Sequence, residues 1–364
     1  MNAKNEPKWM IYGANGFTGS MIARMAHMQG LTPILAGRND EQIVPLATEL
    51  NASYRIFSLE DKQRITDSLS DIDLLLNCAG PFAYTATELI NGCLENDVHY
   101  IDITGEIDVF ELAQSQHDRA RKKRKVLCPG VGFDVVPTDC ISATLKNALP
   151  DAESLTLGFD TEGELSVGTT KTSLLGAQQG GITRQEGKLC HEALGSRERD
   201  IDFGTGIKHA VAIPWGDLAT AWFTTGIGNI EVYMSASPER IRSLKRLNWM
   251  RPLLRIGWIK QLLLQRIGKQ VQNPTSDARL KAPCYVWGEV RNNRGNSKQA
   301  FLSTPNGYDL TVTSALAIVR YLLEYDGGGG YFTPSRLMGT SFVESLPGCS
   351  AITVISYQQG VLDS

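Results

Sequence analysis

Short apolar runs alternate with longer amphipathic stretches over the first third of the chain. The run at residues 10–12 predicts a short buried strand, and residues 21–28 then place apolar side chains at the spacing of one helix face. Further strands are expected within residues 34–36, 54–57, 71–82, 98–106 and 125–139, with helices over 85–96 and 106–124. Six strands that alternate with helices are typical of a doubly wound parallel sheet.

After about residue 135 the pattern changes to short segments rich in β-branched and aromatic residues, separated by turn signals. These segments are LTLGFD, KHAVAIPW, ATAWFTTG, IEVYMSAS, CYVWGEVRN and KQAFLST. They predict a largely antiparallel sheet, and helical stretches are expected near 168–179, 238–269 and 308–324. The predicted fold class is therefore α/β: a Rossmann-like doubly wound parallel sheet plus a mixed α+β second domain.

Three glycines stand three residues apart between the first predicted strand and the first predicted helix. Their spacing, G-x-x-G-x-x-G, is a variant of the dinucleotide-binding fingerprint. Glycine permits the tight turn and a close approach of backbone to phosphate, while the helix N-terminus attracts the pyrophosphate. We expect this turn to bind a dinucleotide, although a plain loop is the alternative. The expected contacts are Gly13, Ala14, Asn15, Gly16, Phe17, Thr18 and Gly19.

Arg38 and Asn39, after the second predicted strand, bear on which dinucleotide binds. An acidic side chain here would hold the ribose 2′-hydroxyl of NAD, whereas an arginine suits a 2′-phosphate. The sequence therefore favours NADP, with NADPH as its reduced form. Asp40 keeps NAD as the alternative, and a solvated loop arginine is the third reading of Arg38.

Composition and charge argue against a nucleic-acid-binding protein and against a cysteine metal site. The chain has 364 residues and 42% hydrophobic content, which is enough for two domains. A net charge of −3 and a pI near 6.0 give no electrostatic footprint for nucleic acid. Seven scattered cysteines without a C-x-x-C pair indicate reduced thiols and no metal site. No signal segment or apolar stretch of transmembrane length is found, so a cytoplasmic location is expected.

Chemistry is expected beyond the carboxyl ends of the strands, in the segments NCAGPF, DITGE and GVGFDVVPTD. Cys78, Ala79, Gly80 and Pro81 are assigned to the cofactor site. The candidate proton sources are Tyr84, Asp102, Thr104, Glu106, Asp134, Asp139 and Lys171, of which Tyr84, Asp134 and Lys171 are assigned as catalytic. Structural alternatives stay open. Asp102 and Asp134 could accept backbone amides, Tyr84 could pack against the core, and Lys171 could be solvated.

Two basic segments need separate interpretations. Residues 119–125 end a predicted helix, where cations favour the negative end of the dipole, and we interpret them as a solvated face. Residues 238–269 carry nine basic residues, one acidic residue and two tryptophans, and contain Pro252 as a break. Such a basic amphipathic region suits anionic lipid headgroups or an acidic carrier protein. A domain helix with its cations in water is the alternative.

The segments YGANGFTG, ILAGRN, LLLNCAGPF, HYIDITGE and GFDVVPTD, in this order, resemble the N-terminal domain of the saccharopine dehydrogenase-like oxidoreductases. Within that group the segments are similar to those of the trans-acting enoyl reductases of bacterial lipid synthesis and their eukaryotic relatives. The resemblance implies a Rossmann-like domain, a mixed domain inserted before a last helix that returns to the first, and NADPH as hydride donor. We accordingly expect an NADP-binding domain at 1–135, a substrate or dimerisation domain at 136–330, and a returning C-terminal helix at 331–364.

The expected function is NADPH-dependent hydride transfer to an apolar conjugated substrate of the enoyl or acyl type. A saccharopine-type imine reductase is one alternative. A non-catalytic, nucleotide-binding scaffold at the membrane surface is another. The expected partners are a small-molecule substrate, free or carrier-bound, the membrane surface through residues 238–269, and a second copy of the chain as a homodimer.

Overall fold

The fold was analysed in a computed structural model, which describes residues 7–161, 178–254 and 283–358, together with 170, 174, 176, 261–263 and 265–266. Two compact units divide the chain. The first unit comprises Met1–Gly132 and Thr311–Phe332, and the second comprises Phe133–Leu310 and Thr333–Ser364. Each unit has its own sheet.

The first unit is built on a parallel sheet of seven strands in the order β15-β6-β5-β4-β1-β2-β3. Its strands are β1 (Trp9–Tyr12), β2 (Ile34–Gly37), β3 (Tyr54–Ile56), β4 (Leu74–Asn77), β5 (His99–Asp102), β6 (Val126–Cys128) and β15 (Gly330–Tyr331). Its helices are α1 (Phe17–Met28), α2 (Asp40–Glu49), α3 (Lys62–Leu69), α4 (Ala86–Glu95), α5 (Ile107–Ser115) and α6 (His117–Lys123), with most of α13 (Gly307–Leu323) and the 3-10 turn η1 (Phe82–Tyr84). This is the predicted doubly wound sheet, and that prediction is confirmed.

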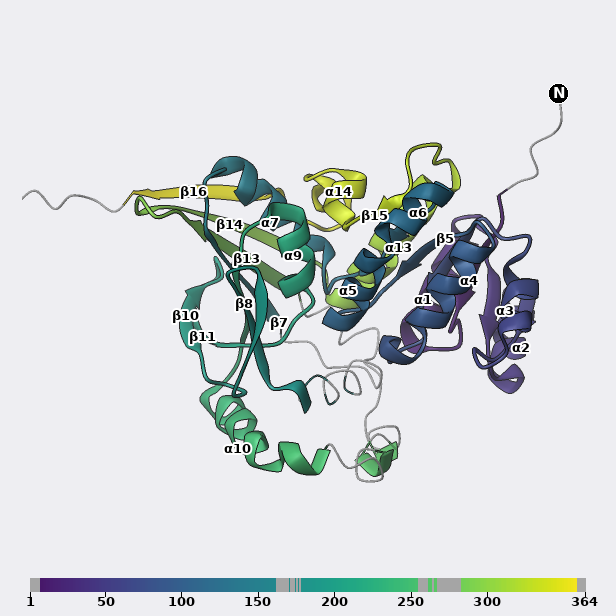
Figure 1. The fold of residues 1–364 in the computed structure, drawn as a ribbon, viewed down its shortest axis with the longest axis horizontal. Helices are drawn as coiled ribbons and strands as arrows, with labels where there is room; N and C mark the ends of the chain where they lie inside the picture. The colour runs from purple at the N-terminus through teal and green to yellow at the C-terminus, as the bar shows by residue number, and fades with distance from the viewer. Residues whose placement is uncertain are drawn as a thin grey trace, which may run out of the picture. The chain divides into compact units, whose positions relative to one another are not determined.

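The continuous apolar runs follow from burial on both faces of this sheet. Every residue of β1, β2, β4 and β5 is buried, and the side chains of Leu74, Leu75 and Leu76 are fully enclosed. Helices cover the strands, as Figure 1 shows in purple and blue. The helices α3, α4, α5 and α6 pack with one another. On α1, Gln29 accepts a hydrogen bond from Arg320 of α13 at 2.7 Å.

The second unit contains a sheet of nine strands whose main path is β10-β11-β12-β7-β13-β14-β16. Its strands are β7 (Ser154–Thr161), β8 (Gly181–Gln185), β9 (Lys188–Glu192), β10 (Glu198–Asp202), β11 (Ile207–Ala212), β12 (Asn229–Ser235), β13 (Cys284–Arg291), β14 (Asn296–Thr304) and β16 (Thr353–Gln358). Its helical segments are α7 (Val136–Ala148), α9 (Asp217–Thr225), α10 (Pro238–Leu254), α14 (Pro334–Met338) and the 3-10 turn η2 (Phe342–Ser345). Among the strands that the structure describes in this unit, all pairs are antiparallel except β12 with β7.

One expected strand is a helix. The segment ATAWFTTG lies in α9, which ends at Gly226 with a left-handed φ of 71°. The helix buries the polar Asp217 and Thr220 together with Leu218, Ala219 and Ala221, so its polar positions do not mark a solvent-exposed face, and its threonine and aromatic residues favour a strand. The same burial conceals α7, which packs so closely on β13 that a Cβ added at Gly288 would lie 2.6 Å from Ile141 Cγ2.

The C-terminal part of the chain is arranged differently from the expected division. Residues 311–332, rather than 331–364, return to the first unit, where β15 extends the parallel sheet beside β6. The last described segment, β16, pairs with β14 in the second sheet instead of forming a helix on the first. The predicted helix near 308–324 is present as α13, and α10 continues through Pro252 to Leu254.

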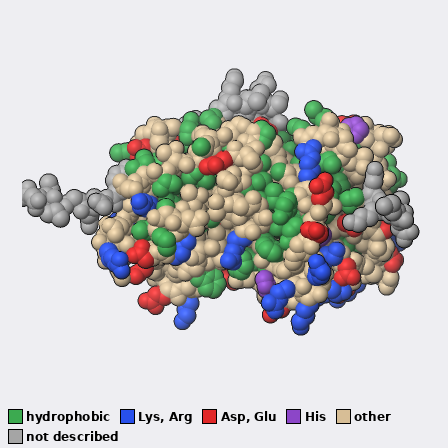
Figure 2. Space-filling view, turned by 90° about the horizontal axis from the view of Figure 1, so that it is seen from above, with side chains coloured by type: hydrophobic (Ala, Val, Ile, Leu, Met, Phe, Trp, Pro, Cys, Tyr) green, Lys and Arg blue, Asp and Glu red, His purple; other side chains and the backbone are tan. Residues whose placement is uncertain are grey.

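Surface charge agrees with the modest net charge of the chain. On the face shown in Figure 2, basic and acidic side chains are interspersed and apolar side chains lie between them. Within the described part of the chain, no helix is both long and apolar enough to cross a membrane.

Candidate functional site: a glycine turn at the end of β1

The turn after β1 has the geometry that the glycine spacing predicts. Gly13 adopts a left-handed φ of 80°, and its amide donates to Ala36 O at 2.8 Å, which ties the turn to β2. A Cβ added at Gly13 would lie 2.7 Å from Ala79 N. This position therefore requires glycine for its backbone conformation and for the close approach of the next loop.

Gly19 and Gly16 have different roles in the same turn. A Cβ at Gly19, inside α1, would lie 2.4 Å from Gly13 O, so this glycine lets the helix pack on the turn. Gly16 is the N-cap of α1 and has an ordinary φ of −68°, and its Cβ would lie 3.2 Å from Gly13 O. Gly16 has no side chain with which to cap this helix end. The first turn of α1 thus offers backbone amides and a positive dipole end to an anion.

The second predicted cofactor segment, Cys78 to Pro81, lies against this turn. Cys78 N donates to Tyr12 O at 2.8 Å, and Ala79 is the neighbour that excludes a Cβ at Gly13. Gly80 is exposed, and the peptide bond between Gly80 and Pro81 is cis. The structure therefore brings together two segments that are more than fifty residues apart in the sequence.

Arg38 lies at the carboxyl end of β2, the place expected for recognition of the ribose. Its side chain is exposed and has no hydrogen-bond or ion-pair partner among the described residues. Burial raises the pKa of Tyr12 to about 12, and the positive charge of Arg38 acts in the opposite direction. The Asn15 side chain donates to Gln42 at 2.6 Å and joins the glycine turn to α2. Arg38 is consequently available to an anionic ligand.

A buried polar network supports the loops after β4, β5 and β6. Asn77 and Asp102 are register partners on β4 and β5, and Tyr100 bridges them: Asn77 Nδ2 donates to Tyr100 OH at 3.2 Å, and Tyr100 OH donates to Asp102 at 2.8 Å. Asp102 also accepts from Thr104 N and Gly130 N at 3.0 and 2.9 Å. Burial raises the pKa of Asp102 to about 6, while these hydrogen bonds oppose the shift. Asp102 therefore holds the backbone amides of Thr104 and Gly130 in place.

Glu106 fixes the loop that carries Tyr84. Its carboxylate accepts from the amides of Phe82 and Ala83, both at 2.8 Å, and Thr104 Oγ1 accepts from Glu106 N at 3.0 Å. Burial raises the pKa of Glu106 although both amide bonds oppose it. Tyr84 itself is 59% exposed and its hydroxyl has no partner among the described residues. Glu106 and Thr104 therefore hold the loop, and the Tyr84 hydroxyl is accessible.

Asp134 differs from the other buried acids because its carboxyl has no hydrogen-bond partner among the described residues. Only its backbone is engaged, since Asp134 O accepts from Trp215 Nε1 at 3.0 Å. Burial raises the pKa of Asp134 to about 7. A partly buried carboxyl with this pKa can hold or release a proton near neutral pH, which is the property of a general acid.

Asp139 and Asp217, by contrast, serve the packing of α7, α9 and α14. Asp139 accepts from Thr224 Oγ1 at 2.5 Å and from Ser335 N at 2.7 Å. Asp217 accepts from Thr138 Oγ1 at 2.7 Å, and its Oδ2 has no partner among the described residues. Burial raises the pKa of Asp217 well above the ordinary range, and nearby carboxylates raise it further. Asp217 thus contributes to packing between α7 and α9.

Two assignments fall wholly or partly outside the described residues. Lys171 lies outside them, so its catalytic assignment stays a prediction. The segment 238–269 is described as helix over α10, and Trp249 in it is 90% exposed. One face of α10 packs on the second unit through Ile241 and through Asn248, which donates to Leu194 O and accepts from Leu194 N, both at 2.9 Å.

Asn77 and Tyr100 are not among the site residues that were predicted from the sequence, although each has a recognisable pattern there. A polar residue ends the apolar run of β4, and Tyr100 stands two residues before Asp102, on the same face of the strand. Asp217 had no comparable signal, because its role depends on contacts with α7.

Comparisons with known proteins also point to an NADP-binding domain in the N-terminal part of the chain. Residues 9–127 match the model of the saccharopine dehydrogenase NADP binding domain. This part of the chain is therefore similar to that NADP-binding domain. Among curated proteins similar to this chain, the human saccharopine dehydrogenase-like oxidoreductase is 27% identical over 194 residues, which are 46% of this chain and 45% of the relative. A trans-acting enoyl reductase of Mycobacterium tuberculosis is 26% identical over 145 residues, 38% of this chain and 35% of the relative.

The similarity in fold extends beyond the saccharopine dehydrogenase NADP-binding domain. The saccharopine dehydrogenase (L-Glu forming) of Saccharomyces cerevisiae superposes with a TM-score of 0.65 over 96% of this chain and 100% of the yeast chain, at 9% sequence identity. At that identity the match concerns the fold alone. The chain spans less than half the length of these two curated relatives, the human and the mycobacterial protein.

Proposed function

We propose that this chain is an NADPH-dependent oxidoreductase that reduces an apolar conjugated substrate of the enoyl or acyl type. The observation that carries the proposal is the glycine turn. It combines a left-handed Gly13 packed on Ala79, an uncapped α1 N-terminus and an Arg38 side chain without a partner among the described residues. A protein that binds no nucleotide has little use for this arrangement.

The residues of the glycine turn and Arg38 suit the phosphate groups of a dinucleotide. The turn amides and the α1 N-terminus would hold the pyrophosphate, and Arg38 would hold the 2′-phosphate. The loop Cys78 to Pro81 would line the other side of the cofactor. When bound, NADPH supplies the hydride. Asp40, whose carboxylate accepts from the Glu41 amide at 2.9 Å, is the residue that would favour NAD instead.

Reduction of a carbon–carbon double bond also takes up one proton, and we assign its supply to Asp134. Three observations support this residue. Its carboxyl is free of hydrogen bonds among the described residues, its pKa is raised by burial to about 7, and it follows β6 in the segment where ligands of doubly wound sheets are expected. The exposed Tyr84 hydroxyl is the second candidate, on a loop that Glu106 holds in place.

An NADPH-oxidation screen distinguishes the proposal from its alternatives. The full chain is tested with enoyl thioesters, cyclic and open imines, and ketones, each with NADPH and with NADH. Turnover of an enoyl thioester supports the proposed substrate class. Turnover of imines alone favours a saccharopine-type reductase. Tight NADPH binding without turnover of any substrate favours the non-catalytic scaffold and contradicts the proposed reaction.

We also propose that α10 contacts an anionic membrane surface. Arg242, Arg246 and Trp249 are exposed at positions four and three residues apart, which places them on one stripe of the helix. An adjacent face of α10 packs on the rest of the unit through Ile241 and Asn248. A tryptophan flanked by arginines suits the headgroup region of a bilayer.

A further inference from the structure

An open cavity of about 550 Å³ lies in the first unit, away from the glycine turn. Three segments line it: Asp97 and His99 at the start of β5, residues 122–125 before β6, and residues 325–327 before β15. These three strands are adjacent and parallel, so the cavity lies at the edge of the sheet where strands begin. The glycine turn follows β1 and lies at the opposite edge, where strands end.

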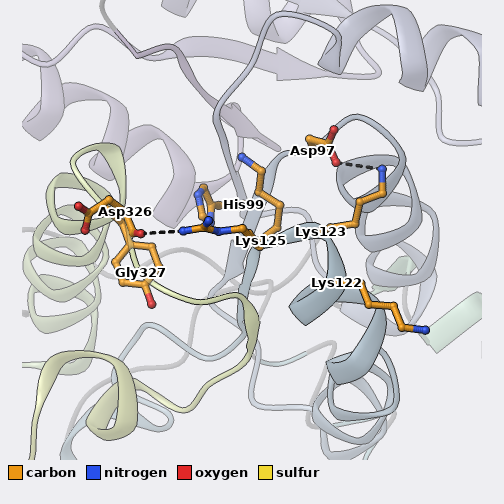
Figure 3. A pocket seen from close by; sticks show the side chains of 9 residues that line it. Asp97, His99, Lys122, Lys123, Lys125, Asp326 and Gly327 are labelled. Carbon is orange, nitrogen blue, oxygen red and sulfur yellow. Dashed lines mark hydrogen bonds and ion pairs between the residues drawn. The ribbon is translucent and has the colours of Figure 1, made fainter.

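The lining is basic. Four consecutive cations, Lys122 to Lys125, and the acidic residues Asp97 and Asp326 are among the residues that line the cavity. Lys123 Nζ pairs with Asp97 at 3.0 Å, and Arg124 Nη2 donates to Asp326 O at 3.3 Å. The Lys125 ammonium has no partner among the described residues, and the same holds for the remaining N–H groups of Arg124. Figure 3 shows Lys125 beside His99, whereas Lys122 extends away from it.

His99 adds a neutral donor to this basic wall. Val126 N donates to His99 Nδ1 at 2.9 Å, so Nδ1 is the acceptor and the proton of the neutral ring is on Nε2. Burial, followed by the nearby Lys125 charge, lowers the pKa of His99 to about 4. The ring therefore offers an N–H donor without a charge at neutral pH.

The backbone holds these groups in place. Arg124 has a left-handed φ of 56° at the C-cap of α6, a position where glycine is the usual residue. The following turn is fixed by the glycine-rich loop: Gly330 N donates to Lys125 O at 2.9 Å, and a Cβ at Gly329 would lie 2.4 Å from Lys125 N. Cations in the last turn of α6 already complement the helix dipole. The dipole does not account for Lys125, which lies beyond the helix, or for an arginine in the left-handed region.

We propose that this cavity binds a phosphate monoester at a site separate from the dinucleotide turn. The Arg124 guanidinium and the Lys125 ammonium would hold two phosphate oxygens, and His99 Nε2 would donate to the third. A rigid arrangement of cations and one neutral donor suits a dianion better than a carboxylate, which has fewer acceptor oxygens. This site does not depend on the proposed reductase activity.

Calorimetric titration of the full chain with inorganic phosphate and with glycerol phosphate tests the site. Lys125→Gln removes the ammonium charge that has no partner among the described residues. Arg124→Gly removes the guanidinium, and because glycine adopts the left-handed backbone conformation without strain, this variant should fold. A loss of phosphate binding in Arg124→Gly would therefore report on the guanidinium and not on misfolding. Each variant is expected to weaken phosphate binding about tenfold or more. Arg64→Gln, at an exposed helix position of the same unit, is the matched control and should bind as the wild type does.

Two further arms separate this site from the glycine turn. Gly16→Val should retain phosphate binding, and the ¹⁵N resonance of His99 Nε2 should shift on addition of phosphate in both the wild type and Gly16→Val. Citrate at equal ionic strength should give no such shift. Failure of the wild type to bind either phosphate saturably overturns the site. Equal phosphate affinity of Lys125→Gln, Arg124→Gly and the wild type would also overturn the site. Loss of phosphate binding in Gly16→Val would overturn it too, because the binding would then depend on the glycine turn.

Discussion

Replacing Asp134 with asparagine tests the proposed proton donor in two independent ways. Burial raises the pKa of Asp134 to about 7 in the folded protein, against an ordinary value of 3.8. A carboxyl whose folded pKa is raised destabilises the fold once it ionises, so its cost is absent at low pH and grows as the pH rises. Asp134→Asn removes this cost together with the acidic proton.

The magnitude follows from the size of the shift. A shift of about three pKa units corresponds to an upper bound of about 4 kcal/mol at pH 8, because each unit is worth about 1.4 kcal/mol. At pH 5 the same group costs at most about 1.7 kcal/mol, since it ionises more readily in the unfolded chain than in the folded one. Asp134→Asn should therefore gain up to about 2.5 kcal/mol in free energy of unfolding over the wild type between pH 5 and pH 8. Water contact of the partly buried side chain reduces this value.

Urea denaturation at pH 5 and pH 8 measures the stability difference, and steady-state NADPH oxidation measures activity on any substrate that the screen identifies. As general acid, Asp134 should give a wild-type kcat that falls above about pH 7, and its removal should lower kcat by a factor of about 10² to 10⁴. Asp139→Asn is the matched control. Both Asp139 oxygens accept hydrogen bonds, from Thr224 and Ser335, so this variant should be destabilised at both pH values.

The two readouts separate a catalytic role from a structural one. A more stable Asp134→Asn variant with wild-type kcat and an unchanged pH profile would remove Asp134 from the reaction. A variant that is less stable at pH 8 than the wild type would contradict the burial argument itself.

Four further substitutions test three other parts of the structure. Arg38→Ala should cost about 1.5 to 3 kcal/mol of NADPH affinity, roughly 10- to 150-fold, and leave NADH nearly unchanged, and equal losses by calorimetry would refute the 2′-phosphate assignment. Gly19→Ala should lower both thermal stability and nucleotide affinity, because its Cβ would lie 2.4 Å from Gly13 O, and an unchanged melting temperature would show that the turn yields easily. Replacing Trp249 with alanine should reduce flotation with anionic vesicles, while Arg242→Glu should reduce it mainly at low salt, and a wild type that ignores such vesicles would exclude α10 as a membrane contact.

The N-terminal unit could be predicted in detail because its signals are local. Buried parallel strands appear as continuous apolar runs, as in Leu74–Leu76, and the glycine turn is specified by spacing. The contact between Gly13 and Ala79 also follows from topology, since β1 and β4 are neighbours in the sheet and both loops leave its carboxyl edge.

The parts that escaped prediction depend on tertiary contacts. The helices α7 and α9 bury polar residues such as Asp139 and Asp217 together with apolar ones, so the polar positions in their sequences do not mark a solvent-exposed face. The return of residues 311–332 to the first unit rests on a two-residue strand, β15, and on contacts such as the Ser314 hydroxyl donating to Val131 O at 2.6 Å. Glu106 accepts hydrogen bonds from the amides of Phe82 and Ala83, which are more than twenty residues away, and no spacing in the sequence predicts such a bond.

The central claim is that the turn after β1 binds the pyrophosphate of NADPH, and calorimetric titration of the wild type and Gly16→Val with NADPH tests it most directly. A Cβ at Gly16 would lie 3.2 Å from Gly13 O on a backbone that any residue adopts, so the variant should fold. Valine would nevertheless occupy the place where backbone and pyrophosphate meet. The account predicts saturable NADPH binding by the wild type and none by a folded Gly16→Val. Equal binding by the two proteins, or no binding by the wild type, would contradict it.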